Sequence, residues 1–225
     1  MSYIVKSSEK TRKSGAETET KALLYLMNLR KDSEEIYYFI VDFFNDLTGM
    51  DAFSDKLWDI QSKEAKGNSP KAIGKELVTL FKNYMYDFDF ADYILFVGGV
   101  SNTVRIDDEI NSFGIENVNF DALLKMVEGL KEETKEKEYI DDKDITDTNI
   151  SDFFKKVRFV VDDRKPSEYV KDIIKDHPGL VPEEKVLDMQ LRLKELHMYL
   201  MYLPSKCGTI LLTRYMKKSS PTMKK

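Results

Sequence analysis

The chain has 225 residues, of which 42% are hydrophobic and 33% are charged, a composition typical of a globular protein with a sizeable core. The net charge of −5 is too mild for composition alone to indicate a nucleic-acid partner. No stretch approaches the roughly 20 apolar residues that a membrane-spanning helix needs. The single cysteine, Cys207, excludes an internal disulfide. These properties predict a cytoplasmic protein in a reducing compartment, without membrane contact.

Charge is distributed unevenly along the chain. The stretches from Lys6 to Lys13 and from Lys206 to Lys225 are basic, whereas the stretch from Glu132 to Asp152 is acidic. Local fields, and not the total charge, should therefore decide whether a polyanion binds. The sequence divides into four predicted parts, which are a flexible basic N-terminus (1–13), a core (14–105), a mainly helical part packed on the same domain (106–216) and a basic tail (217–225).

Hydrophobic periodicity predicts the elements in chain order. In the first half these are a helix from Ser14, strands at about 36–44 and 57–63, a helix from Pro70 to about Tyr86 and a strand at 91–97. The second half is mainly helical, with a helix from Phe120 to about Lys137, a strand at 156–161, helices beginning at Pro166 and Pro182 and a short strand at 209–213. This order predicts an α/β fold with a mixed central sheet flanked by helices.

Polar residues interrupt the predicted strands at one place. Asp46 follows the first apolar run, and Gln61 and Lys63 lie two residues apart in the next strand, on the same face as Asp59. If the two runs pair as a hairpin, Asp46 comes close to Gln61 and Lys63. A carboxylate, an amide oxygen and an ammonium group at one sheet edge can hold a hard cation and polarise a phosphate.

This arrangement resembles the PD-(D/E)XK nuclease superfamily. The restriction-endonuclease-like core of that superfamily is a helix with an acid, a hairpin with an Asp, an (Asp/Glu/Gln)-X-Lys triplet, a helix and a further strand. Asp46 and the triplet Gln61-Ser62-Lys63 match this pattern. Within the superfamily, residues 14–99 are most similar to the DNA-endonuclease domain of CD-NTase-associated anti-phage effectors. The shared features are the Ser14-Gly15-Ala16 helix start, the triplet, the lysine-rich helix after Ser69-Pro70 and the strand that ends in glycines.

The resemblance implies a Mg²⁺-dependent endodeoxyribonuclease, with Mn²⁺ as an alternative ion. Asp46, the Gln61 side-chain oxygen, the Ser62 carbonyl and Glu19 (or Glu17) of the first helix would hold the metal. Lys63 would lower the pKa of the attacking water or stabilise the phosphate. DNA contacts are expected from lysines in and next to the helix after Pro70, namely Lys66, Lys71, Lys75 and Lys82. The implied partners are double-stranded DNA and a second copy of the chain or a regulatory sensor subunit.

Each candidate residue also has an ordinary structural interpretation. Asp46 can initiate a turn, and Asp42 is a rival acid within the first strand. Gln61 and Lys63 can form a solvated strand face, acids of a first helical turn can serve the helix dipole alone, and the lysines can be a solvated helix face. The alternative hypothesis is therefore a non-catalytic protein- or nucleic-acid-binding module on a nuclease-like fold.

Overall fold

The computed structural model describes residues 13–64, 67–86, 90–165, 167–168 and 171. Several sequence predictions lie outside the described residues, among them Lys66, Cys207, most of the predicted helix from Pro166, the predicted helix from Pro182 and the predicted strand 209–213.

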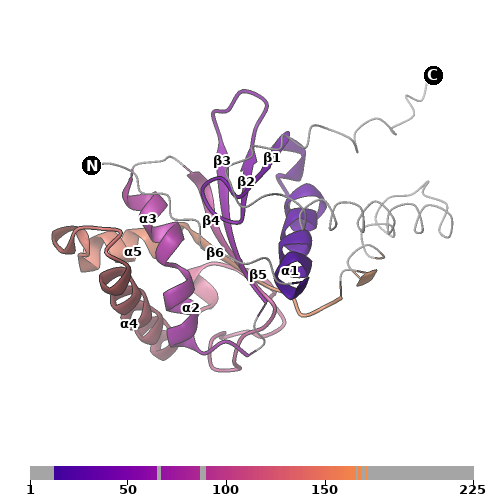
Figure 1. Cartoon of the computed structure of the whole chain (residues 1–225). Helices are drawn as coiled ribbons and strands as arrows, with labels where there is room; N and C mark the ends of the chain where they lie inside the picture. Colours follow the sequence, from indigo (N-terminus) through magenta and orange to yellow (C-terminus); the bar gives the residue numbers. More distant parts are fainter. Residues whose placement is uncertain (1–12, 65–66, 87–89, 166, 169–170, 172–225) are drawn as a thin grey trace, which may run out of the picture.

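The centre of the fold is a six-stranded sheet with the strand order β1-β2-β3-β4-β6-β5 (Figure 1). β1, β2 and β3 are antiparallel neighbours, β3, β4 and β6 run parallel, and β5 is antiparallel to β6. The strands are β1 (Tyr38–Val41), β2 (Leu47–Met50), β3 (Leu57–Lys63), β4 (Phe90–Val97), β5 (Ser112–Phe113) and β6 (Val157–Val161). The mixed α/β fold predicted from the sequence is confirmed.

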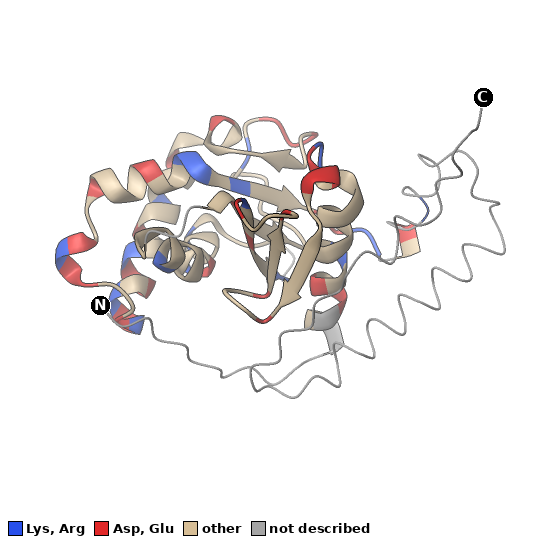
Figure 2. Ribbon diagram, turned by 90° about the horizontal axis from the view of Figure 1, so that it is seen from above, with Lys and Arg blue, Asp and Glu red and all other residues tan. Residues whose placement is uncertain are grey.

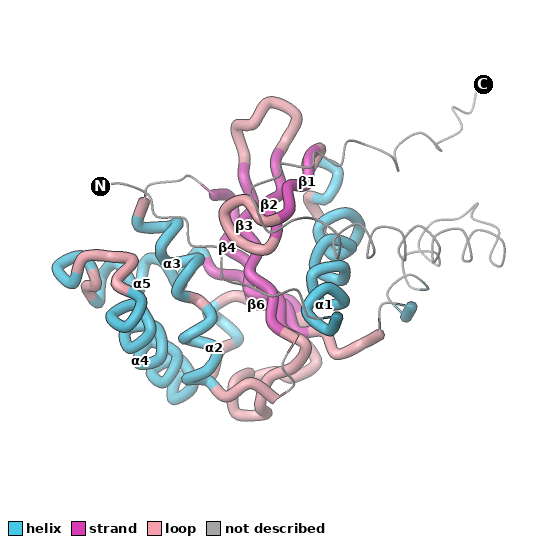
Figure 3. Tube along the Cα trace, in the orientation of Figure 1, coloured by secondary structure: helices cyan, strands magenta, loops and turns pink. Residues whose placement is uncertain are grey.

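Helices cover both faces of this sheet (Figures 1 and 3). α1 (Lys13–Leu24) packs on one face, where its apolar residues meet Ile60 and Ile94. The other face is covered by α2 (Pro70–Glu76), α3 (Val78–Met85), α4 (Phe120–Lys137) and α5 (Asp147–Lys156). Because successive strand residues point to opposite faces, Gln61 lies on the α2–α5 face. Within the described residues, no helix is long and apolar enough to cross a membrane.

Side-chain caps explain where three of these helices begin. The Ser69 hydroxyl accepts a hydrogen bond from the Ala72 N–H at 3.3 Å, and Pro70 starts α2. Asn119 caps α4 through the Asp121 N–H at 3.1 Å. Thr146 caps α5 in the same way. Each cap satisfies an N–H group that the first helical turn leaves without a partner.

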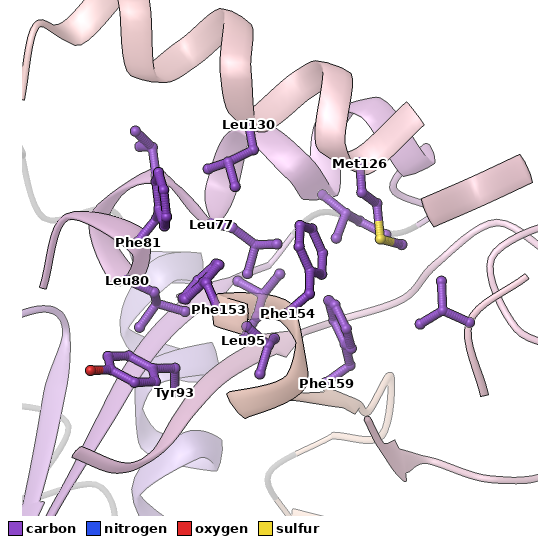
Figure 4. Close-up of a cluster of buried hydrophobic side chains, with 14 of the residues drawn as sticks. Leu77, Leu80, Phe81, Tyr93, Leu95, Met126, Leu130, Phe153, Phe154 and Phe159 are labelled. Atoms are coloured by element: carbon purple, nitrogen blue, oxygen red, sulfur yellow. The ribbon is translucent and has the colours of Figure 1, made fainter. Parts of the chain in front are cut away.

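The core between the sheet and α2–α5 is rich in aromatic rings (Figure 4). The ring of Phe153, on α5, has its centroid 5.1 Å from that of Phe81 on α3 and 5.7 Å from that of Tyr93 on β4. Phe154 and Phe159 are also fully buried in this cluster. Residues of the predicted core (14–105) and residues of the predicted helical part that follows it (106–216) thus share one hydrophobic core.

Two glycines allow α2 and α4 to approach each other closely. A Cβ atom on Gly74 would collide with the carbonyl oxygen of Met126, and one on Gly129 would collide with the carbonyl oxygen of Lys71. The close contact brings the acidic face of α4 onto the lysines of α2, which bears on the predicted DNA contacts.

The structure corrects three predicted elements. The runs 36–44 and 57–63 do not pair with each other, because β2 lies between β1 and β3 and pairs with both. The predicted helix 70–86 is two helices, α2 and α3, which meet at Leu77. α5 occupies part of the acidic stretch 132–152, where no separate helix was expected. The bounds predicted for β3 and α4 are confirmed.

Candidate metal site at the end of strand β3

Asp46 lies opposite Gln61 at the point where β2 begins. The register pairs Leu47 with Ile60. Asp46 directly precedes Leu47 and Gln61 directly follows Ile60, so the two residues face each other across the antiparallel pair. Asp46 Oδ2 accepts hydrogen bonds from Gln61 Nε2 at 3.2 Å, from the Ser62 N–H at 2.6 Å and from the Ser62 hydroxyl at 2.7 Å. The structure therefore brings three of the predicted site residues into direct contact.

The Gln61 amide determines how well this group fits a cation. Its Nε2 donates to Asp46 Oδ2 and, at 3.5 Å, to the Ser62 carbonyl, while its Oε1 accepts from the Thr79 hydroxyl at 3.1 Å. Two oxygens predicted to be metal ligands thus converge on one electropositive N–H group. A cation could replace that group if the amide turned over, because the Thr79 hydroxyl can donate to an oxygen or accept from a nitrogen.

Lys63 ends β3 on the same strand face as Gln61. Its Nζ lies 2.9 Å from Oε1 of Glu76, at the end of α2, and the two side chains are 45% and 28% exposed. The ammonium group therefore lies at the carboxyl end of β3 and remains accessible to a substrate. Glu76 was not predicted as a site residue, because its pairing with Lys63 depends on how α2 crosses the strand.

The predicted helix acid is Glu19, with Glu17 as its rival. Both lie on α1, which packs on the Ile60 face of the sheet, whereas Gln61 meets Thr79 of α3 on the other face. The carboxylate that pairs with Lys63 is that of Glu76. The assignment of Glu19 to the site stays a prediction.

The rival acid Asp42 is an exposed residue of the turn between β1 and β2. It has a positive φ of 54°, and its N–H donates to the Asp46 carbonyl at 3.2 Å. Asp and Asn tolerate this left-handed conformation better than most residues. The turn therefore contains Asp42, and Asp46 is the acid that meets Gln61.

A buried polar layer lies directly behind these residues. Asp59 is 0% exposed, and its Oδ2 accepts from the Asn45 side chain at 2.8 Å and from the Asn83 side chain at 2.7 Å. Burial raises the pKa of Asp59 to about 7, against the lowering effect of the two asparagine hydrogen bonds. Thr48, opposite Asp59 in β2, is also 0% exposed. The alternation of β3 pointed to Asp59 alone, and the asparagines were not expected.

Two of the predicted DNA-binding lysines, Lys71 and Lys75, form ion pairs with glutamates of α4. Lys71 pairs with Glu128 at 2.7 Å and with Glu132 at 2.8 Å, and Lys75 pairs with Glu132 at 3.2 Å. These glutamates raise the pKa values of both lysines. Figure 2 shows acidic and basic residues interleaved along the described helices. Local charge on this surface is therefore mixed.

Lys82, which was predicted to contact DNA with Lys71 and Lys75, is buried. It is only 8% exposed and lies over the Tyr139 ring, 5.4 Å from its centroid, and burial lowers its pKa. Lys82 lies on α3 and Lys71 and Lys75 lie on α2, so the three lysines do not share one continuous helix. A buried ammonium group cannot serve as a surface phosphate contact.

A separate cavity of about 390 Å³ lies at the carboxyl ends of β4 and β6. Its walls include Arg105, which donates to the Asn111 side chain at 3.1 Å, and Arg164, which pairs with Asp162. Asp46, Gln61 and Lys63 do not line it. The cavity is therefore separate from the candidate site at the end of β3.

The candidate site depends on oxygen ligands of more than one kind. Among the described residues, no group of three or more His, Cys, Asp or Glu side chains lies close enough to hold a metal ion. A cation at Asp46 would rely on amide and carbonyl oxygens for its other protein ligands. Mg²⁺ and Ca²⁺ accept such neutral oxygens, but they bind them less strongly than they bind carboxylates. Comparison of the chain with protein-family models, with curated proteins and with solved structures gave no match.

Proposed function

We propose that this chain is a metal-dependent DNA endonuclease that hydrolyses phosphodiester bonds on a PD-(D/E)XK-like core. The observation that carries the proposal is the convergence of Asp46 Oδ2 and the Ser62 carbonyl on the Gln61 amide. Lys63 lies two residues farther along the same strand face. The order of a helix, three antiparallel strands, helices and a parallel strand also supports the proposal.

Each residue of the site then has a definite task. Asp46, the Gln61 oxygen after the amide has turned over, and the Ser62 carbonyl would hold Mg²⁺ or Mn²⁺, which when bound neutralises charge on the phosphate. The Lys63 ammonium group exchanges Glu76 for a phosphate oxygen when DNA binds, and so stabilises the negative charge that develops during hydrolysis. Glu76 is the second carboxylate of the site, in place of Glu19.

The biological setting follows from the resemblance to the CD-NTase-associated effectors. As part of the proposal, the chain acts in the cytoplasm of a bacterium in defence against phage. One site of this kind cuts one strand, so cleavage of double-stranded DNA requires two copies of the chain or a larger assembly. A regulatory sensor subunit would keep such an enzyme inactive until infection.

The second candidate function is a non-catalytic binding module on the same fold. The ion pairs of Lys71 and Lys75 with α4 favour it, because they neutralise the charges expected to contact DNA. The single carboxylate at the Gln61 amide also favours it, because a cation there would be held weakly. The two functions make opposite predictions about cleavage.

Plasmid cleavage with Mg²⁺ or Mn²⁺, and with EDTA, distinguishes the two functions. We expect metal-dependent cutting that falls by at least about a hundredfold in Asp46→Ala and in Lys63→Ala, because each removes a group that acts on the reacting phosphate. Asp42→Asn, in the same loop as Asp46, and Lys56→Ala, at an exposed lysine just before β3, are the matched controls, since Asn tolerates the left-handed backbone at position 42. Equal cutting by Asp46→Ala and the parent would rule out this site.

A second pair of variants tests the assignment of the acid. Glu76→Gln should reduce cleavage, whereas Glu19→Gln should leave it near the parent value, because α1 lies on the other face of the sheet. The reverse result would return the helix acid to α1.

A further inference from the structure

Asp59 is an acid in the interior of the fold, where it interacts electrostatically with the buried Lys82. It lies in the middle of β3 and is 0% exposed, and burying an acid costs free energy unless its partners compensate. Its Oδ2 accepts from the Asn45 amide at 2.8 Å and from the Asn83 amide at 2.7 Å. Two side chains from different elements thus converge on one carboxyl oxygen.

The two asparagines lead to the two ligand residues of the candidate site. Asn45 directly precedes Asp46, so the bond to Asp59 anchors the loop that presents Asp46. Asn83 lies one helical turn after Thr79 on the same face of α3, and the Thr79 hydroxyl bonds to Gln61 Oε1 at 3.1 Å. Asp59 therefore connects to Asp46 through the loop and to Gln61 through the helix.

Two buried polar atoms of the layer around Asp59 have unsatisfied hydrogen-bonding capacity. Asp59 Oδ1 and Thr48 Oγ1, on residues paired across β2 and β3, are buried and have no hydrogen-bond partner among the described residues. Stability alone would favour an apolar residue at position 48, because an unsatisfied buried polar atom is destabilising. At position 59 an apolar residue could not accept from the two asparagine amides that Asp59 holds.

We propose that Asp59 is a positioning residue, which fixes the Asp46 loop and α3 so that Asp46 and Gln61 present their oxygens to one divalent cation. The cation in this statement rests on the function proposed above. The placement of Asp46 by Asp59 and Asn45 does not depend on it, and can be measured without metal.

The Ser62 amide reports whether Asp46 is in place. Its N–H donates to Asp46 Oδ2 at 2.6 Å, so its resonance in a ¹H–¹⁵N NMR spectrum should move when that bond is lost. We expect Asn45→Ala to move this resonance toward its position in Asp46→Ala. Asn45 is a half-buried loop residue, so this variant leaves the core closed, whereas Asp59→Leu removes both anchors but puts folding at greater risk.

Two further variants make the readout specific. Thr48→Val removes a buried hydroxyl on the same sheet face that bonds to neither asparagine, so it should leave the Ser62 resonance unchanged. Asp59→Asn keeps one oxygen that can accept from both amides and should also leave it unchanged. An unmoved Ser62 resonance in folded Asn45→Ala would overturn the proposal.

The cation is tested by titrating Mn²⁺ into the same proteins in a calorimeter. Loss of residues that orient metal ligands typically weakens affinity by about tenfold to a hundredfold, and we expect at least about tenfold in Asn45→Ala, with Asp59→Asn close to the parent. Unchanged Mn²⁺ affinity in Asn45→Ala would overturn the proposal. If the parent shows no Asp46-dependent Mn²⁺ binding, the proposed function fails, and the Ser62 resonance still decides whether Asp59 and Asn45 position Asp46.

Discussion

Two halves of the same sheet face carry opposite kinds of side chain. Over β4 and β6, Tyr93 and Phe159 pack with the aromatic rings of α3 and α5. Over β2 and β3, the same face presents Thr48, Asp59 and Gln61. Both halves are covered by helices, so exposure to solvent does not account for the difference.

The comparison separates residues that stabilise the fold from residues that do not. Buried aromatic rings contribute large apolar areas and ring contacts. A buried carboxylate with one unsatisfied oxygen, next to an unsatisfied threonine, contributes little to stability and is a liability unless it serves another purpose. Departures from the rules of good packing are expected at functional sites, and here they gather behind Asp46 and Gln61.

The largest effect is expected in the aromatic half. Phe153→Ala should lower the free energy of unfolding by about 3–5 kcal/mol, because it opens a cavity among rings from three elements. Urea denaturation monitored by fluorescence or circular dichroism measures this change. Phe120→Ala is the control, since Phe120 is 70% exposed and its loss should change stability by less than about 0.5 kcal/mol. Similar losses in both variants would contradict the placement of Phe153 in the core.

The polar half should make stability depend on pH. The pKa of Asp59 is raised from 3.8 to about 7, mainly by burial, so between these values the folded protein holds a proton that the unfolded chain has released. The free energy of unfolding should therefore fall as pH rises through this window, by at most about 1.4 kcal/mol per pH unit, and level off above it.

Asp59→Asn isolates this contribution, because an amide does not titrate. The difference in unfolding free energy between the parent and Asp59→Asn, measured in EDTA from about pH 4 to pH 8, should change in favour of the variant as pH rises. Parallel profiles for the two proteins would show that Asp59 is not buried as an acid with a raised pKa.

Thr48 offers a smaller and opposite test of the polar half. Thr48→Val should raise the free energy of unfolding by about 1 kcal/mol, because it removes a buried hydroxyl that has no partner among the described residues and keeps the side-chain shape. Thr134 is the matched control, since it is equally buried but donates to the Leu130 carbonyl at 2.7 Å. Thr134→Val should not stabilise the protein, and equal effects at both positions would remove the distinction.

The length and regularity of each element explain how much of the fold was predictable from the sequence. β3 and α4 have long, regular patterns, and both begin and end where the periodicity predicts. β2 was missed because it has only four residues and contains Thr48-Gly49, which have the chemistry of a turn. The boundary between α2 and α3 was missed because Leu77 is neither Gly nor Pro, and packing sets the break there.

The candidate site shows the same limit. Contact between Asp46 and Gln61 could be anticipated, because strand alternation and a local antiparallel pairing are sufficient for it. Glu76 and Asn83 could not, because they come from helices whose rotation against the sheet is set by tertiary packing. The glutamates that pair with Lys71 are likewise distant in sequence, with Glu128 57 residues away, and no local pattern in the sequence connects them.

The smallest effect on stability is expected on the surface of α2, where the predicted DNA contacts meet α4. Lys71→Gln with Lys75→Gln should change the free energy of unfolding by no more than about 1 kcal/mol, because exposed ion pairs contribute little. If DNA displaces the glutamates from these lysines, the double variant should bind a short duplex more weakly and lower the salt dependence by about one released counterion per lysine. Glu128→Gln with Glu132→Gln should have the reverse effect, since it removes both ion pairs of Lys71 and the shorter of the two ion pairs of Lys75. Lys155→Gln, an exposed lysine paired with Asp152 on α5, is the control. Binding that is equal in all three variants would assign Lys71 and Lys75 to the contact between α2 and α4 alone, because a lysine that meets phosphate cannot be removed without changing the salt dependence.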